Sequence, residues 1–262
     1  MALSVDACVA QHQGDRKEQQ DRVAILSHPR QRSVVMAVVA DGMGGHSGGA
    51  LAAEQVVHTA RNCLEHFAPS SESPLHLLEE SLLEAHGMIK SSRLINEKDP
   101  HSTAAILLLQ ARQATWVHCG DSRIYHFRRG HLVTRSVDHS YVEHLIASGR
   151  ITPEEAATHP NRNILITSLG GKEKPKFDFG GAGNLADGDS FVLCSDGRWA
   201  FFDDDERGSI VAAFPAREAS RMLREKARQR AGGVGDNVSL VIIKLNEPES
   251  LPGTPASGAA RR

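Results

Sequence analysis

Five aspartates are the residues of this 262-residue chain best suited to act together in one chemical site. Asp41, Asp121 and Asp196 each end an apolar run typical of a strand, whereas Asp21 and Asp236 each precede one. Alternate strand ends meet at the same edge of an antiparallel sheet, so these carboxylates can converge although they are far apart in the chain. Clustered carboxylates raise one another's pKa and therefore favour bound cations. An all-oxygen site prefers hard divalent ions, which predicts Mg²⁺ or Mn²⁺.

Each aspartate also has a plain structural interpretation, because Asp-Gly is a strong hairpin signal. Asp41-Gly42, Asp187-Gly188 and Asp196-Gly197 all carry this dipeptide. We interpret Asp187-Gly188 as a turn, since it lies among polar residues just before a strand. The turn interpretation is weaker for Asp41, because residues 42–49 lead to a helical pattern and not to a partner strand.

The glycine cluster after the first of these aspartates raises the alternative of a nucleotide-binding loop. A dinucleotide fingerprint that begins at Gly42 and Gly44 needs a third glycine at position 47, which is Ser47. Gly44 and Gly49 have the P-loop interval, but Ala50 stands where that motif requires lysine. The glycines are better explained by a close approach of the backbone, including the Gly42 carbonyl, to a metal ion.

Periodicity indicates the elements that must position these residues. The expected strands are 23–27, 33–40, 103–109, 114–119, 123–128, 131–136, 163–167, 176–179, 190–194 and 238–245. The expected helices are 51–67, about 75–89, 141–148, one that starts at the capping box of residues 152–155, and 219–230. Hairpin-like strand pairs with helices in blocks favour antiparallel sheets over a doubly wound parallel sheet. Strands that are apolar on both faces, such as 34–40, predict two stacked sheets with helices outside.

Composition excludes several classes of protein. Hydrophobic residues make up 40% of the chain, which supports a buried core and excludes global disorder. The 30 Lys and Arg residues nearly balance 32 Asp and Glu residues, so we expect no nucleic-acid partner. The longest apolar run, 34–40, is far shorter than the ~20 residues of a membrane helix, and residues 1–14 lack a signal-peptide pattern. We therefore expect no membrane insertion.

The cysteines predict a cellular compartment, and the histidines predict no further metal site. The four cysteines are scattered without CxxC spacing, which predicts free thiols in a reducing, cytoplasmic location. The 14 histidines are also scattered, so we interpret them as surface residues and predict no zinc site from them.

An ordered set of short motifs resembles a known family. The motifs are Arg16…Asp21, Asp41-Gly42-Met43-Gly44-Gly45-His46, Ser102-Thr103-Ala104, Gly120-Asp121-Ser122-Arg123, Asp138-His139-Ser140, Ser195-Asp196-Gly197 and Gly235-Asp236-Asn237. Together they resemble the metal-dependent protein phosphatases (type 2C serine/threonine phosphatases), in particular the compact bacterial form. The resemblance covers about residues 10–245, and its specificity comes from the ordered set because no single motif is decisive.

The resemblance implies an α+β fold, a four-layer αββα sandwich of two antiparallel sheets flanked by helices. We expect one phosphatase domain over residues 1–246, with a helical flap at about 138–170. Residues 247–262 turn to Pro, Gly, Ser and Ala without periodicity, which predicts a disordered tail.

The resemblance also implies a centre of two Mn²⁺ or Mg²⁺ ions and a weaker third ion. The implied metal ligands are Asp21 (through water), Asp41, Gly42 (through its carbonyl), Asp121, Asp196 and Asp236. Asp41 would bridge the two ions, Asp196 and Asp236 would hold one of them, and these three form the catalytic set. Asp121 would share the third ion with Asp196.

The implied reaction needs no side-chain nucleophile. Two metals lower the pKa of a bridging water, and the resulting hydroxide attacks phosphorus in line without a covalent intermediate. Arg16, five residues before Asp21, matches the family's phosphate-binding arginine, and a guanidinium can grip phosphoryl oxygens bidentately.

The expected function is therefore dephosphorylation of phosphoserine and phosphothreonine proteins in bacterial signalling, opposing or acting on a serine/threonine kinase. An alternative is a catalytically silent, phosphoprotein-binding regulator on the same fold, although such proteins typically lose metal aspartates. The same chemistry directed at a regulator of a sigma-factor cascade or at small phosphoesters also stays open. The flap sets substrate access, and its sequence does not reveal which substrates it admits.

Several positions depart from the family or carry no role. Gln19 and Gln20 stand where the bacterial pattern usually has Asn followed by Glu or Gln, and Gln19 is expected to loosen the loop. Met43 stands where eukaryotic relatives carry a histidine proposed as general acid. Bacterial members commonly have methionine at this position too. We expect His46 and His139 to be structural.

Overall fold

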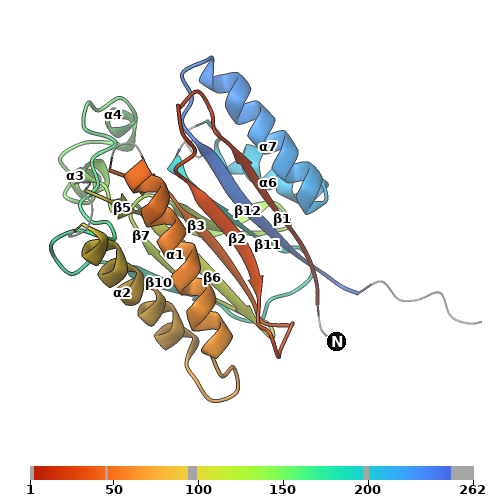
Figure 1. Cartoon of the computed structure of the whole chain (residues 1–262). Coiled ribbons are helices and arrows are strands. Elements are labelled where there is room, and N and C mark those ends of the chain that lie inside the picture. The colour runs from red at the N-terminus through yellow and green to blue at the C-terminus, as the bar shows by residue number, and fades with distance from the viewer. Residues whose placement is uncertain (1–2, 45–46, 94–98, 197–200, 249–262) are drawn as a thin grey trace, which may run out of the picture.

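Two five-stranded antiparallel sheets form the centre of the computed structural model (Figure 1), which describes residues 3–44, 47–93, 99–196 and 201–248. The first sheet has the order β1 (Ser4–His12), β12 (Val238–Asn246), β11 (Asp189–Cys194), β8 (Arg123–Arg128) and β9 (His131–Arg135). The second has the order β10 (Asp178–Ala182), β7 (Gln113–Cys119), β6 (Ala104–Gln110), β3 (Val35–Ala40) and β2 (Arg22–Ser27). A short ribbon pairs β4 (Gly42–Met43) with β5 (His101–Ser102).

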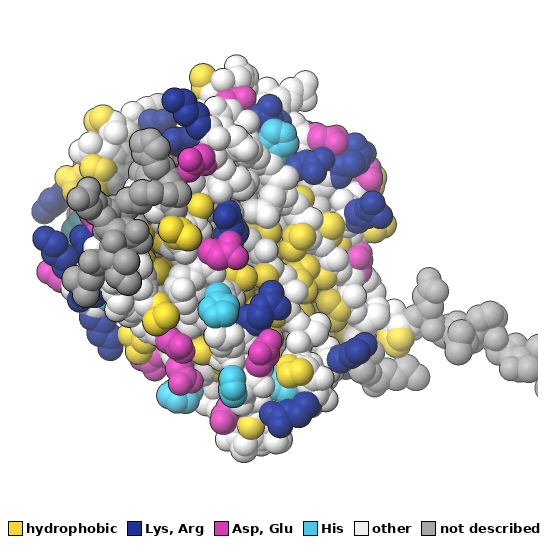
Figure 2. All heavy atoms as spheres, in the orientation of Figure 1, with side chains coloured by type: hydrophobic (Ala, Val, Ile, Leu, Met, Phe, Trp, Pro, Cys, Tyr) yellow, Lys and Arg dark blue, Asp and Glu magenta, His cyan; other side chains and the backbone are white. Residues whose placement is uncertain are grey.

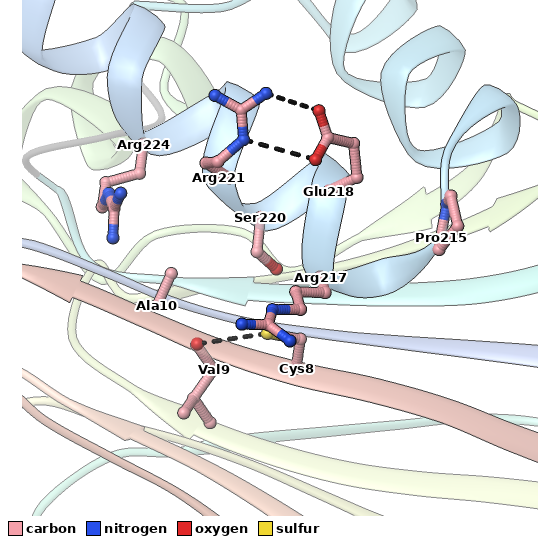
Figure 3. Close-up of a pocket in the computed structure, with 9 residues that line it drawn as sticks. All are labelled: Cys8, Val9, Ala10, Pro215, Arg217, Glu218, Ser220, Arg221 and Arg224. Atoms are coloured by element: carbon pink, nitrogen blue, oxygen red, sulfur yellow. Dashed lines mark hydrogen bonds and ion pairs between the residues drawn. The ribbon is translucent and has the colours of Figure 1, made fainter.

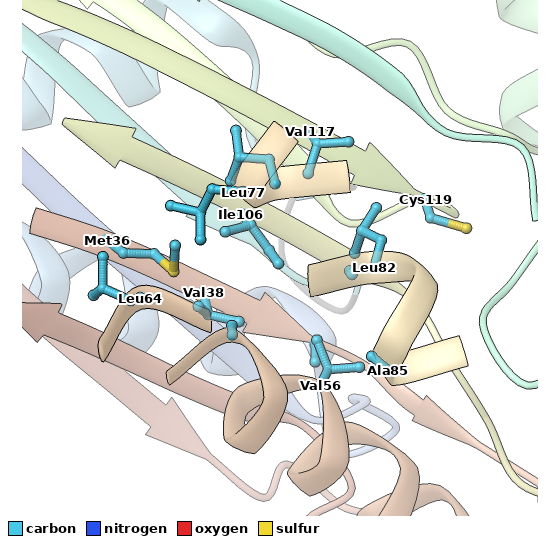
Figure 4. Packing of buried hydrophobic residues seen from close by; sticks show 14 of the residues in the cluster. Met36, Val38, Val56, Leu64, Leu77, Leu82, Ala85, Ile106, Val117 and Cys119 are labelled. Atoms are coloured by element: carbon cyan, nitrogen blue, oxygen red, sulfur yellow. The ribbon is translucent and has the colours of Figure 1, made fainter. Parts of the chain in front are cut away.

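Helices cover the outer face of each sheet. The second sheet packs against α1 (Ser47–His66) and α2 (Pro74–Ser92), and the first packs against α6 (Asp204–Ala213) and α7 (Ala216–Ala231). Figure 4 shows the outer cluster of the second sheet, where Met36, Val38 and Ile106 meet Val56 and Leu82 of the helices. The expected αββα sandwich is confirmed.

β3 explains why an antiparallel strand can be apolar throughout. Its even-numbered side chains, such as Met36 and Val38, pack toward α1 and α2. Its odd-numbered side chains, such as Val35 and Val39, pack between the two sheets. Successive side chains of a strand point to opposite faces, and here both faces are buried. All six residues of β3 are buried as a result.

The expected strand 163–167 is wrong, because Leu165 forms only an isolated bridge with Ser140. The strand expected at 176–179 lies at Asp178–Ala182 instead. β1 and α6 were not expected. β1 mixes polar and apolar residues with no clean alternation, and α6 starts with three consecutive acidic residues that mask its apolar face. Asp21 therefore precedes the second strand and not the first.

Local turn and cap signals agree with the structure. Thr152 Oγ1 accepts from the Glu155 backbone N–H while Glu155 Oε2 accepts from the Thr152 N–H, which forms the expected capping box of α4 (Pro153–Ala157). Arg129 and Gly130 both have positive φ in the turn between β8 and β9. Gly188 also has positive φ, as the turn interpretation of Asp187-Gly188 expects.

A second short helix, α3 (Tyr141–Ala147), is capped by Ser140, whose side chain accepts from the Glu143 N–H. None of the helices in the described ranges is both long and apolar enough to cross a bilayer. The tail expectation falls on residues 249–262 and the His46 expectation on residue 46, both of which lie outside the described residues.

Candidate active site

A cleft of about 600 Å³ opens where strand ends of the two sheets meet. Its wall contains the following sequence-predicted residues: Arg16, Asp41, Gly42, Asp121, Asp196 and Asp236. The second sheet supplies Asp41 after β3 and Asp121 after β7, whereas the first sheet supplies Asp196 after β11 and Asp236 before β12. Asp21 lies at the start of β2 and is buried behind this wall.

The carboxylates are close enough to perturb one another. Burial, followed by the charges of Asp21 and Asp196, raises the pKa of Asp41 well above its ordinary value. Burial and the charge of Asp196 likewise raise the pKa of Asp121. Strongly perturbed carboxyl groups gathered in one cleft are typical of a functional site. Cations would relieve this repulsion, because an opposite charge favours the ionised form.

Asp21 is held on one side only. Its Oδ2 accepts a hydrogen bond from Ser195 Oγ at 2.8 Å, whereas its Oδ1 is buried and lacks a hydrogen-bond partner. Burial raises the pKa of Asp21 to about 7, although hydrogen bonds from Ser239 and Ser195 oppose this shift. A buried carboxylate oxygen without a partner fits a water or a cation on that side. The residues present therefore fit a hard divalent ion.

Asp41 is positioned through its backbone. The Asp41 N–H donates to Thr103 Oγ1 at 3.0 Å, and its carbonyl accepts from the Thr103 N–H at 2.9 Å. The next residue, Gly42, has no room for a side chain, because a Cβ there would lie 2.0 Å from the Gly49 carbonyl oxygen. The start of α1 thus packs directly against the backbone at the cleft.

Arg16 reaches across the cleft to the carboxylates. Its guanidinium forms an ion pair with Asp236, and its side chain is 63% exposed. The hydrogen bond and charge of Asp236 raise the pKa of Arg16, with smaller contributions from Asp196 and Asp41. The arginine is therefore within reach of the cluster and open to solvent, as a group that meets an incoming anion must be.

Asn237 ties together the loop that carries Arg16. Its Nδ2 donates to the carbonyl oxygens of Gln13 at 2.7 Å and Glu18 at 3.0 Å, and its Oδ1 accepts from the Gln20 N–H at 2.7 Å. Asn237 lies within one of the sequence motifs, but the sequence predicted no role for it. Its position beside Asp236 was the only available signal. Thr103 and Ser195 also lie within the motifs, whereas Ser239 lies outside them, and the sequence predicted no role for any of the three.

His139 supports the loop before Asp121. Its Nδ1 accepts from the Gly120 N–H at 3.2 Å, so Nε2 carries the proton and faces Asp178 Oδ2 at 3.2 Å. Ligand atoms of His118, His139 and Asp178 lie within 4.8 Å of one another. The two imidazoles are stacked with an interplanar angle of 12°, however, and a metal ion cannot lie in both ring planes. We interpret the trio as packing, in agreement with the structural role expected for His139.

Comparison with known proteins matches this chain to a family. The family model for protein phosphatase 2C matches residues 10–230. Protein phosphatase PhpP of Streptococcus pneumoniae is 32% identical over 228 residues, which cover 82% of this chain and 87% of the relative. Serine/threonine protein phosphatase PstP of Mycobacterium tuberculosis is 31% identical over 214 residues, which cover 80% of this chain and 40% of PstP.

Solved structures agree with the sequence relatives. The Mycobacterium tuberculosis phosphatase PstP/Ppp superposes with a TM-score of 0.81 at 27% identity, covering 94% of this chain and 100% of that one. The PstP catalytic domain in complex with two manganese ions gives a TM-score of 0.79 at 26% identity, with coverage of 94% and 100%.

The fold and the carboxylate cleft together define a metal-dependent phosphatase. The chain belongs to the protein phosphatase 2C family and is a serine/threonine protein phosphatase of the bacterial type. Its substrates are accordingly phosphoproteins.

Proposed function

We propose that this phosphatase hydrolyses phosphoserine and phosphothreonine with two divalent ions, Mn²⁺ or Mg²⁺, held in the cleft between the sheets. The observation that carries the proposal is the gathering of four aspartates and Arg16 on the wall of one cleft, with Asp21 directly behind it. The related PstP domain, which was solved with two manganese ions, supports the number of ions.

The residues that would hold the ions are those that the resemblance to the family implies, and all of them lie in the cleft or directly behind it. Asp41 and the Gly42 carbonyl would ligate from the second sheet, Asp196 and Asp236 from the first, and Asp21 through water. Asp121 would share a weaker third ion with Asp196. When bound, the ions would activate a water for in-line attack on phosphorus without a covalent intermediate.

Side chains of the protein itself would bind the phosphate and position the loop that carries Arg16. In the phosphate-bound state Arg16 would exchange its ion pair with Asp236 for a bidentate contact with the phosphoryl oxygens. None of the described residues that line the cleft is Ser, Thr, Cys or His, which supports attack by water over attack by a side chain. Asn237 would hold the loop that carries Arg16 in place beside Asp236.

The physiological setting is part of the same proposal. We propose that the enzyme opposes a bacterial serine/threonine kinase in the cytoplasm, and that the kinase is itself among its phosphoprotein substrates. The four cysteines are free thiols, which supports a reducing compartment.

The decisive experiment is hydrolysis of a phosphothreonine peptide by the purified chain in millimolar Mn²⁺, with Asp196→Asn as the test variant. We expect release of phosphate by the native chain and loss of nearly all activity in the variant. Calorimetric titration with Mn²⁺ tests the alternative, a silent phosphoprotein-binding regulator, which would bind little metal. Absence of turnover, or activity that survives Asp196→Asn, would contradict the proposal.

A further inference from the structure

β1 is an edge strand with few of the features that normally protect an edge. It pairs with β12 on one side, and on its other side it makes no backbone ladder with any strand in the described ranges. Its nine residues contain neither lysine nor proline. The one acid, Asp6, is already engaged, because its carboxylate accepts from the Ala216 N–H at 2.8 Å. Unpaired edges without lysine, proline or a bulge are templates for another strand.

The two faces of this edge differ in chemistry. Cys8 and Ala10 face α7, whereas Ala7 faces the other sheet. Val5 and Val9, on the same face as Ala7, are 43% and 44% exposed. Figure 2 shows hydrophobic side chains gathered on this side of the molecule, over the region of β1 and β2 in Figure 1. The inner face of the edge is therefore apolar and partly exposed at Val5 and Val9.

The outer face opens into a cationic cavity. A cavity of about 500 Å³ lies between β1 and α7 and is bordered by Arg217, Arg221 and Arg224 (Figure 3). Positions 217, 221 and 224 follow the helical spacing of four and three, so their side chains share one face of α7. Arg221 is paired with Glu218 and Glu225, and Arg224 lies 3.7 Å from Glu225. Arg217, in contrast, has no acidic partner among the residues that the structure describes.

A buried hydroxyl also lines this cavity. Ser220 is 1% exposed, and its Oγ has no hydrogen-bond partner. A buried polar group without a partner is costly, so the site is more stable when an acceptor or donor enters it. Figure 3 places Ser220 on the side of α7 that faces β1, near Cys8.

We propose that the groove formed by β1 and the arginines of α7, here called the β1–α7 groove, binds an extended acidic segment of a partner protein as an added strand. In such a strand, alternate side chains would lie on opposite faces. Acidic side chains would meet Arg217 and Arg224, and apolar side chains would cover Val5 and Val9. Main-chain hydrogen bonds to the β1 edge would supply affinity, and charge would supply specificity.

A second copy of this chain fits the groove less well. Antiparallel pairing of two β1 strands about a twofold axis would place both α7 helices on the same face of the joined sheet. The Arg217 side chains, which have no acidic partner in the described residues, would then face one another across the seam. Like charges in this arrangement repel, whereas an acidic strand is attracted.

The test uses fluorescence anisotropy with a labelled, end-capped peptide of four Val-Glu repeats and the full chain. We expect saturable binding that weakens with salt and is absent for four Val-Lys repeats. The double variant Arg217→Glu/Arg224→Glu should weaken binding at least tenfold. Arg150→Glu, the same change at one exposed arginine outside the groove, should leave binding unchanged. All three proteins should keep phosphatase activity, since none of these arginines lines the catalytic cleft.

Backbone methylation separates strand addition from simple attraction of charges. One peptide carries N-methyl groups on its valines and another on its glutamates, so that each blocks one edge of the peptide strand. We expect one of these peptides to lose binding and the other to retain it. The proposal is overturned if both bind equally, if no binding occurs at millimolar peptide, if the double variant binds as the native chain does, or if light scattering shows that β1 pairs with a second copy.

Discussion

Asp21 is the residue whose environment is most plainly incomplete in the protein alone. Ser195 donates to its Oδ2 and hydrogen bonds from Ser239 and Ser195 lower its pKa, while Oδ1 is buried without a partner. The adjacent charges of Asp196 and Asp236 add to the cost of ionising it. A group in this state makes folding and metal binding depend on pH, because each equilibrium changes its protonation.

The raised pKa of Asp21 predicts the direction of a stability change in metal-free protein. The pKa is about 7 in the folded state against an ordinary value of 3.8, so the folded state binds more protons between these values. Stability should therefore fall as pH rises from about 4 to about 7. Asp21→Asn removes this contribution, and we expect the EDTA-treated variant to melt above the native chain at pH 7.5, with no difference near pH 4. Thermal unfolding measured across this pH range checks the prediction, and equal melting temperatures at pH 7.5 would contradict it.

Arg16 is expected to act on substrate and not on metal. Arg16→Ala removes the bidentate phosphate contact, so KM for a phosphothreonine peptide should rise roughly tenfold or more. The same change frees Asp236 from its ion pair, and Mn²⁺ affinity should stay equal or rise. Steady-state kinetics and calorimetry measure the two effects separately. Arg16→Lys is the control, because it keeps the positive charge but loses the bidentate guanidinium. A collapse of Mn²⁺ binding would show that the pair is structural.

At the scale of elements, the site depends on contacts between segments that lie far apart in the chain. The loop between β1 and β2 carries Arg16 and is held by Asn237 at the start of β12. Gly14 in the same loop has a φ of +69° and lies so close to Asp236 that a Cβ would come within 2.0 Å of its carbonyl oxygen. The loop is therefore tied to the start of β12 by hydrogen bonds and by close backbone packing.

Asn237→Ala tests this coupling. The change leaves the Gln20 N–H and two carbonyl groups without their partner, which costs about 1–3 kcal/mol for a buried group. We expect lower kcat/KM and a lower melting temperature together. Asn237→Asp keeps the acceptor oxygen but loses both donors, so it should recover only part of the stability. An Ala variant with native kinetics would mean that Asn237 has no positioning role.

Two glycines provide a matched pair for the packing of α1 against the cleft. In Gly42→Ala the new Cβ would clash with the Gly49 carbonyl oxygen at 2.0 Å, so we expect loss of Mn²⁺ binding and marked destabilisation. Gly87 lies within α2 and has no atom within 4 Å of the position of a new Cβ. Gly87→Ala should therefore stabilise the protein by about 0.5–1 kcal/mol. Chemical denaturation of both variants gives the comparison, and similar effects at the two sites would contradict it.

At the scale of the whole molecule, the cleft is a joint between the two sheets. Asp41 and Asp121 come from one sheet, and Asp196 and Asp236 come from the other. Ions shared by these ligands would hold the two sheets together at this end of the sandwich. Metal binding should therefore stabilise the complete fold and not only a local loop.

Mn²⁺ should raise the melting temperature of the native chain. At 100 times the dissociation constant the expected gain is about 2.7 kcal/mol for one site. Asp41→Asn and Asp196→Asn, one from each sheet, should lose most of this gain, whereas the exposed change Asp205→Asn in α6 should retain it. Scanning calorimetry with and without Mn²⁺ measures the effect. An equal gain in all four proteins would place the metal elsewhere.

The expectations that held are those that depend on local patterns. β3, the Asp187-Gly188 turn and the capping box of α4 follow from an apolar run, a turn dipeptide and cap chemistry within a few positions. The position of each aspartate at a strand end also followed from local information, whereas their meeting in one cleft required the two sheets to stack. Local patterns record which side chains are buried and where the chain turns, and short-range physics is sufficient for that.

Tertiary packing alone decided the rest. β1 has a weak pattern and exists as a strand because β12 pairs with it from Ser4↔Asn246 to His12↔Val238. Asn237 acquires its role from a bond to Gln13 across 224 positions, and no short window of sequence contains both partners. The open β1–α7 groove likewise depends on where the first sheet ends. Long-range pairing is selected by the packing of the whole chain, so its consequences become visible only after folding.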